Sequence, residues 1–139
     1  MTKPQLYAFL STQKLGVLSS VCSGNTPQSA LIGIAITPEL EIVFDTVKTS
    51  RKYANLVACP NCSLVAGWHG ETTVQYEGVA EELTDGRLEA YKQVYFAAFP
   101  DGPERERWPG IVYFRVRPRW VRFSDFSQRP PRIEEIHWP

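Results

Sequence analysis

Apolar and polar residues alternate along most of this chain in short runs, and Gly, Pro, Asn and Asp separate one run from the next. Strict alternation predicts strands, because successive side chains of a strand point to opposite faces and only one face needs to be buried. We therefore expect a mainly β protein with six strands. They cover residues 15–21, 29–36, 41–46, 62–68, 72–83 and 111–123.

Three segments instead show the repeat of about 3.6 residues that is typical of an amphipathic helix. These helices are expected at residues 3–12, 50–58 and 84–98. Residues 104–107 suggest one more short turn. The tail over residues 124–139 is too rich in proline for a helix, so we expect it to pack as an extended cover.

The size and charge of the chain narrow the classes of protein that it can belong to. Its 139 residues are 43% hydrophobic, enough for a single compact domain over residues 1–139. Fifteen basic residues balance fifteen acidic ones, so no overall field attracts nucleic acid or an anionic membrane. The chain has no apolar run of bilayer length, and its start resembles an amphipathic helix rather than a signal peptide. We expect a cytoplasmic protein without nucleic-acid or membrane partners.

Three cysteines, including the pair Cys59 and Cys62 with C-x-x-C spacing, raise the question of redox or metal chemistry. A redox pair places its first thiol at the start of a helix, whereas Cys59 follows the end of the helix at 50–58. A zinc site needs two further ligands, and the remaining candidates lack paired spacing. We predict no metal site and identify no catalytic acid or base; His69, at a turn, is the weak candidate.

A polar turn links the strand at 41–46 to the helix at 50–58. It gathers the hydroxyls of Thr46 and Ser50 with the cations of Arg51 and Lys52, beside the free N–H groups of a helix start. This combination suits a phosphate, and we call these four residues the clamp. An ordinary N-cap followed by a solvated basic face has the same pattern, and spacing alone does not separate the two interpretations.

The residues around this turn resemble a known family. The resemblance is carried by Phe44-x-Thr46, Ser50-Arg51-Lys52, Leu56, Pro60, Ser63-Leu64 and Trp68. This order is similar to the FMN-binding half of the pyridoxamine 5'-phosphate oxidase-like split barrels, and the likeness covers roughly half of the chain. It implies a six-stranded antiparallel Greek-key split β-barrel with flanking helices.

The resemblance also implies a cofactor, FMN, and the residues that bind it. The clamp would hold the 5'-phosphate, the strand containing Gly33 would lie along the flavin ring, and two residues of the strand at 72–83 would reach the ring. From the residues alone, Gly33 marks either a bulge or a place where a flat group approaches the backbone. The implied cofactor-binding residues are Ala30, Leu31, Ile32, Gly33, Asp45, Thr46, Ser50, Arg51, Lys52, Thr73 and Gln75.

The chain departs from the family pattern at two positions. Ala30 and Ala35 stand where pyridoxamine-phosphate oxidases carry an Arg and a Lys that contact the cofactor. The loss of two cations changes how the flavin would be held, and it puts true pyridoxamine-phosphate oxidase activity in question.

The function implied by the resemblance is that of an FMN-dependent oxidoreductase acting on a small substrate. The family is generally homodimeric, with the cofactor at the subunit interface. Trp120 and its neighbouring arginines either lie on the solvent-facing side of a strand or form a wall of the partner's cofactor site. Two alternatives stay open: a non-enzymatic flavin- or haem-binding module, and a deazaflavin-dependent reductase.

Overall fold

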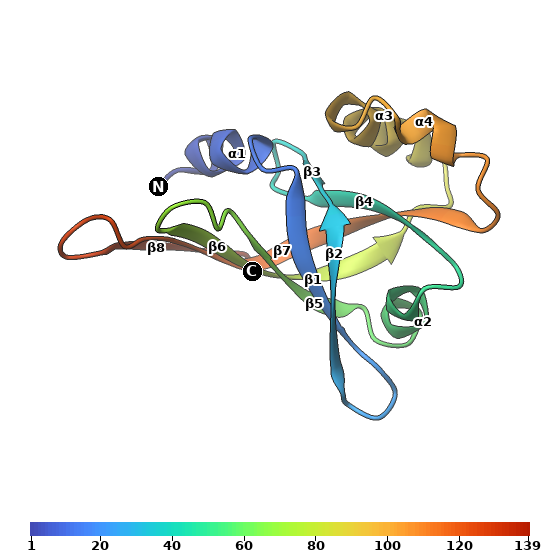
Figure 1. Ribbon diagram of the computed structural model, residues 1–139, viewed down its shortest axis with the longest axis horizontal. Coiled ribbons are helices and arrows are strands. Elements are labelled where there is room, and N and C mark those ends of the chain that lie inside the picture. Colours follow the sequence, from blue (N-terminus) through green and yellow to red (C-terminus); the bar gives the residue numbers. More distant parts are fainter.

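An antiparallel sheet of eight strands forms the body of the computed structural model, which describes residues 1–139 (Figure 1). The strands are β1 (Leu15–Val21), β2 (Pro27–Gly33), β3 (Ala35–Ile36), β4 (Ile42–Val47), β5 (Asn61–Ala66), β6 (Thr72–Glu82), β7 (Ile111–Asp125) and β8 (Arg132–His137). They are ordered β2-β1-β5-β6-β7-β4-β3, and β8 also pairs with β7. The mainly β, split-barrel-like fold is confirmed, but the expected count of six strands is wrong.

The two additional strands have separate causes. The strand expected at 29–36 is divided at Ile34, because residues up to Gly33 pair with β1 whereas Ala35 and Ile36 pair with β4. The tail is extended as expected, but it also forms β8, which pairs with the C-terminal half of β7.

Strand β7 can hold two partners on one edge because its pairing changes at its middle. Its first half pairs with β4 and its second half with β8, while β6 follows its other edge throughout. Between the two halves the β6–β7 register shifts at Glu77 and Gly78, opposite Pro118. Proline has no N–H for the ladder, which accounts for a bulge at this position within the continuous strand β7.

Four helices accompany the sheet: α1 (Lys3–Ser11), α2 (Arg51–Ala58), α3 (Leu88–Ala98) and α4 (Gly102–Arg105). A capping box starts α1, in which Thr2 N–H donates to Gln5 Oε1 at 2.8 Å and Gln5 N–H donates to Thr2 Oγ1 at 3.2 Å. Helix α3 starts later than expected, because Asp85 accepts the N–H of Arg87 at 2.9 Å and holds residues 84–87 in a turn. None of these helices combines the length and the apolar character needed to cross a bilayer.

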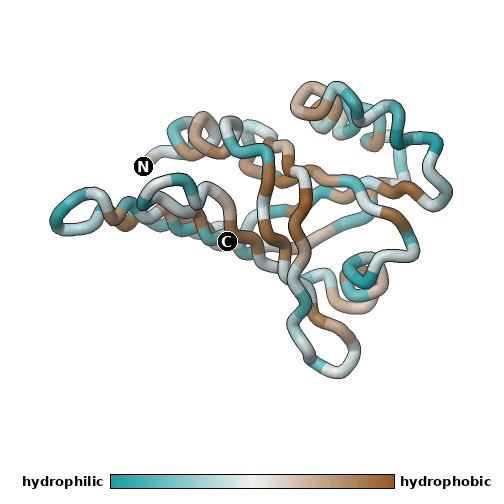
Figure 2. Tube along the Cα trace, viewed as in Figure 1, coloured by the Kyte–Doolittle hydropathy of each residue, from teal (hydrophilic) through white to brown (hydrophobic).

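Two clusters of buried side chains hold these elements together. The larger lies inside the curl of the sheet, where Phe44 and Phe114 stack with ring centroids 5.3 Å apart. The smaller lies between α3 and the other face of β4, and it includes Val43 and Tyr95. Figure 2 shows hydrophobic segments where the strands cross and hydrophilic ones mainly at the hairpin ends, while the helices carry residues of both kinds. Phe44 belongs to the larger cluster and Val43 to the smaller one, so alternate residues of β4 face different clusters.

Candidate cofactor site

The start of α2 brings three of the four clamp residues together. Ser50 caps the helix, since its Oγ accepts the N–H of Tyr53 at 3.3 Å. The hydroxyls of Thr46 and Ser50 share a hydrogen bond of 2.9 Å, and Lys52 Nζ donates to Thr46 Oγ1 at 3.4 Å. Both interpretations of the turn hold here: Ser50 is an ordinary N-cap, and it also sits in a cluster of hydroxyls beside a cation.

A cavity of about 140 Å³ connects the clamp to the edge of the sheet. Its lining consists of Leu18, Ser20, Gln28, Ser29, Ala30, Arg51 and Lys52. No carboxylate lies among them, and two of them are cations. Arg51 is exposed and pairs with no acidic side chain of the chain. Burial lowers the pKa of Lys52 from its ordinary value, while the charge of Asp45 opposes this effect.

This lining fits a phosphate. A small cavity with hydrogen-bond donors and two cations offers an anion the contacts that it loses on leaving water. Ala30, expected beside the cofactor, lies in the same cavity as Arg51 and Lys52 although it is some twenty residues away in the chain. The sheet brings them together, because β2 is the edge strand next to α2.

The side chain of Asp45 lies away from the clamp. One of its oxygens accepts from Arg105 Nε at 3.0 Å, and the other accepts from the Tyr95 hydroxyl at 3.1 Å. Both partners belong to the α3–α4 region on the other face of β4. Although Asp45 is next to Thr46 in sequence, the structure commits its carboxylate to holding these helices on the sheet.

Strand β2 presents its predicted ring-contacting residues to both faces of the sheet. Ala30 and Ile32 point inward, whereas Leu31 points outward and is 61% exposed. Gly33 lies under a flat group, but that group is the ring of Phe99: a Cβ added at Gly33 would come within 2.8 Å of it. The close approach expected at Gly33 is thus made by the chain itself.

Thr73 and Gln75 do not join the cavity. They lie on the outer face of β6, where Gln75 is exposed between Val65 of β5 and Arg122 of β7. Thr73 Oγ1 makes a long hydrogen bond of 3.5 Å to Ala66 O. Within one chain, the sheet separates these two side chains from Arg51 and Lys52.

Sequence reasoning missed three residues beside the cavity: Ser20, Gln28 and Asn55. Asn55 is only 6% exposed, which is unusual for an amide in a short surface helix. The signal in the sequence was a polar residue on the apolar side of α2, directly before buried Leu56.

The cysteines and histidines offer no reactive cluster. Cys62 is half-buried, and burial raises the pKa of its thiol to about 12, so it holds little of the reactive thiolate. No group of three or more His, Cys, Asp or Glu side chains is placed to hold a metal ion. His69 is exposed at a turn, and His137 contacts Glu135 on β8 at 3.1 Å.

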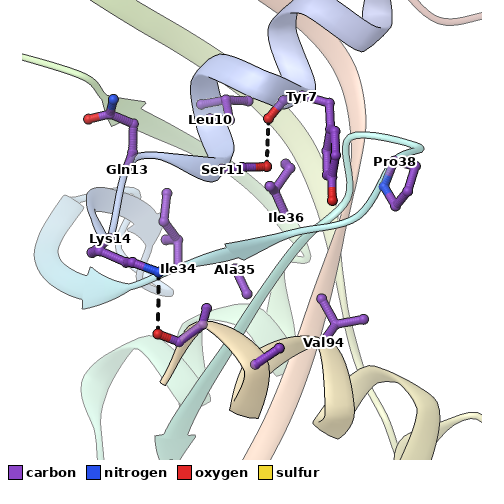
Figure 3. A pocket seen from close by; sticks show the side chains of 12 residues that line it. Tyr7, Leu10, Ser11, Gln13, Lys14, Ile34, Ala35, Ile36, Pro38 and Val94 are labelled. Atoms are coloured by element: carbon purple, nitrogen blue, oxygen red, sulfur yellow. Dashed lines mark hydrogen bonds between the residues drawn. The ribbon is translucent and has the colours of Figure 1, made fainter. Parts of the chain in front are cut away.

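A second cavity, of about 370 Å³, lies between α1, β3 and α3 (Figure 3). Most of its lining is apolar, and Lys14 crosses one side to donate to Ala98 O at 3.4 Å. None of the expected cofactor-binding residues lines it, and it has a single cation. The cavity at the clamp is the candidate cofactor site because expected cofactor-binding residues, Ala30, Arg51 and Lys52, line it.

Comparisons with known proteins agree with this picture. The family described as pyridoxamine 5'-phosphate oxidase matches residues 2–125. A protein from Nocardioides sp. named pyridoxine/pyridoxamine 5'-phosphate oxidase is 36% identical over 93 residues, which is 66% of this chain and 42% of that protein. The chain thus spans less than half the length of this relative.

Two solved structures show the same fold at low sequence identity. A haem-binding protein from Mycobacterium smegmatis has a TM-score of 0.83 at 14% identity, over 97% of this chain and 57% of that one. A pyridoxamine 5'-phosphate oxidase-related, FMN-binding protein from Nostoc punctiforme has a TM-score of 0.65 at 10% identity, over 91% and 87%. The resemblance seen around the clamp is confirmed by the family match, which extends from α1 to the end of β7: the chain belongs to the pyridoxamine 5'-phosphate oxidase family.

Proposed function

We propose that this protein is an FMN-binding flavoprotein that acts as an oxidoreductase on a small substrate. The observation that carries the proposal is the cavity in which Ala30 of β2 meets Arg51 and Lys52 of α2 without any carboxylate. A phosphate monoester carries about 1.5 to 2 negative charges at neutral pH, so a donor-lined cavity with two cations matches it in charge and size.

The residues of the chain divide the binding of FMN between them. Arg51 is free to make a forked contact to two phosphate oxygens, and Lys52 contributes a second charge. Thr46 and Ser50 do not line the cavity, but Thr46 is hydrogen-bonded to Lys52 and to Ser50, so their hydroxyls would contribute from beside it. The free N–H groups of the α2 start lie at the same end of the helix. When bound, the flavin supplies the hydride chemistry, and the protein binds and orients it.

The two alanines that depart from the family pattern argue for a substrate other than pyridoxamine phosphate. Ala30 lines the phosphate cavity without contributing a charge. Ala35 is 5% exposed and packs in the apolar cluster under α3, so no cation reaches the cofactor from that position. The proposed activity is therefore that of a family oxidoreductase with a different small substrate.

A second copy of the chain would complete the site. Gln75 and Thr73 face outward, on the opposite side of the sheet from the clamp, and they share this face with exposed apolar side chains. Leu31, Val17, Val65 and Gln75 form one continuous cross-strand row on it. Exposed apolar patches of this kind mark protein contacts. A homodimer with FMN at the interface brings the outer face of one subunit to the clamp of the other.

The visible spectrum of the purified protein, followed by identification of the group released on denaturation, tests the cofactor. We expect a yellow protein that releases FMN. A haem spectrum would overturn the proposal in favour of a haem-binding module, and retention of a deazaflavin in preference to FMN would favour a deazaflavin-dependent reductase.

Titration of variants with FMN tests the clamp. Arg51→Ala should weaken binding by about 1.5–3 kcal/mol, the usual contribution of a hydrogen bond to a charged group. Lys48→Ala is the matched control, because Lys48 is an exposed cation of the same turn that does not line the cavity. Equal FMN affinities for Arg51→Ala and wild type would show that the clamp does not hold the phosphate.

A further inference from the structure

The buried amide of Asn55 makes two hydrogen bonds that determine how its neighbours face the cavity. Its Nδ2 donates to Ser20 Oγ at 3.0 Å and to Gln28 Oε1 at 3.0 Å. An amide nitrogen has two hydrogens, so both donors of Asn55 are used. Asn55 therefore acts as a donor to β1 and β2 from the inward face of α2.

This arrangement leaves the donor groups of both partners available. Because Gln28 accepts through Oε1, its Nε2 forms the other end of the amide, and it donates to no atom of the chain. Ser20 likewise accepts from Asn55 through Oγ, which leaves its own hydrogen free. Both side chains line the cavity that contains Arg51 and Lys52.

Gln28 is placed to compensate for the arginine that the family pattern has at position 30 and this chain lacks. It lies two residues before Ala30 on β2, so both side chains point to the same face of the strand. Ala30 lines the cavity but has no polar group to offer an anion. An amide at position 28 supplies a donor from the same strand, although without a charge.

From these contacts we propose that Gln28 is a ligand of the cofactor's phosphate and that Asn55 is the positioning residue that turns the Gln28 amide and the Ser20 hydroxyl toward it. The proposal rests on the proposed function and names residues beyond the clamp. The polar groups that this proposal directs into the cavity can all donate, and none is a carboxylate. The ligand that they fit is therefore one that ends in a phosphate monoester.

A comparison of FMN with riboflavin, which lacks the phosphate, isolates this contact. Gln28→Met keeps the length of the side chain and removes the free donor without adding a charge that would itself repel a phosphate. FMN affinity should fall about 10- to 100-fold, from the usual contribution of a hydrogen bond to a charged group. Riboflavin affinity should change less than about twofold. Gln93→Met, at an exposed position on α3, is the control.

Asn55→Asp tests the positioning role with the same pair of ligands. An aspartate at this position accepts instead of donating, so Ser20 and Gln28 would turn their hydrogens toward it and away from the cavity. FMN affinity should fall while riboflavin affinity is retained, and Gln28→Leu should add little further loss in this background. The melting temperature of each variant is measured alongside.

The results separate this inference from the proposed function. If FMN and riboflavin affinities fall together, Asn55 and Gln28 only support the fold, and the inference is wrong. If neither falls, Gln28 does not contact the phosphate, which also overturns it. Failure of the proposed function would look different, because wild type would then show no preference for FMN over riboflavin and no sensitivity to Arg51→Ala.

Discussion

Replacing Asp45 with Asn tests whether this carboxylate serves the fold or the cofactor. Its side chain is 13% exposed and accepts from Arg105 Nε at 3.0 Å and from the Tyr95 hydroxyl at 3.1 Å. Asn has nearly the same shape but loses the charge and one acceptor oxygen. The guanidinium of Arg105, 18% exposed, would then keep Asp101 as its one carboxylate partner, beside its weaker contact with the Tyr95 hydroxyl at 3.4 Å.

The expected loss follows from these contacts. A hydrogen bond to a charged group contributes about 1.5–3 kcal/mol, and the partial exposure of the pair favours the lower half of this range. With an unfolding entropy of about 2.1 cal/mol/K per residue, a loss of about 1.5–2 kcal/mol lowers the melting temperature of a domain of this size by about 5–7 °C. Differential scanning calorimetry measures both quantities.

Asp101→Asn is the matched control for this variant. Asp101 contacts the same guanidinium at 2.9 Å, but its side chain is 64% exposed, so the loss should stay below about 1 kcal/mol. FMN affinity at pH 7 should change less than about twofold in Asp45→Asn, because this carboxylate faces α3. The reasoning is refuted if Asp45→Asn melts like wild type, or if it loses as much FMN affinity as Arg51→Ala.

Three further predictions concern pH, assembly and thiol chemistry. Desolvation lowers the pKa of Lys52 below its ordinary value of 10.5, and a bound phosphate favours the charged amine. FMN affinity should therefore fall as the pH rises through this lowered pKa. Over the same pH interval the ligand-free protein should gain stability, because the unfolded chain binds more protons than the folded one. If FMN affinity falls in the same way for Lys52→Arg, whose side chain stays charged, the assignment to Lys52 is wrong. Leu31→Glu should convert a dimer into a 15.8 kDa monomer in light scattering and weaken FMN binding, while Val57→Glu, equally exposed on α2, should not; a monomeric wild type would refute the dimer. Iodoacetamide should modify Cys22 well before Cys62, because backbone hydrogen bonds within its turn lower the pKa of Cys22 whereas burial raises that of Cys62. Equal rates of modification, followed by mass spectrometry, would contradict the burial of Cys62.

The strands were predictable wherever one face is buried and the other is exposed to solvent. Alternation along β6 and β7 located both, because each side of these strands meets a different environment. Strand β8 was not predicted. Its residues 132–137 alternate between half-buried and exposed, with none fully buried, and the segment before them contains two prolines. Its pairing depends on the edge of β7 that β4 leaves free, which no local pattern describes.

The faces of β4 show the limit of reasoning from neighbours in sequence. Asp45 and Thr46 are adjacent, and the resemblance placed both at the cofactor. Successive side chains of a strand point to opposite faces, so only Thr46 reaches the clamp, while Asp45 meets Arg105 from a helix sixty residues later.

By itself, the sequence determined the clamp, because Thr46, Ser50 and Lys52 lie within seven residues and the geometry of a helix start brings them together. Only the tertiary structure decided what the clamp faces. The register of β2 on β1 places Gln28 and Ala30 beside Arg51, and the ring of Phe99 packs over Gly33. Contacts between distant segments depend on how the whole sheet packs, and a local pattern of residues does not contain that information.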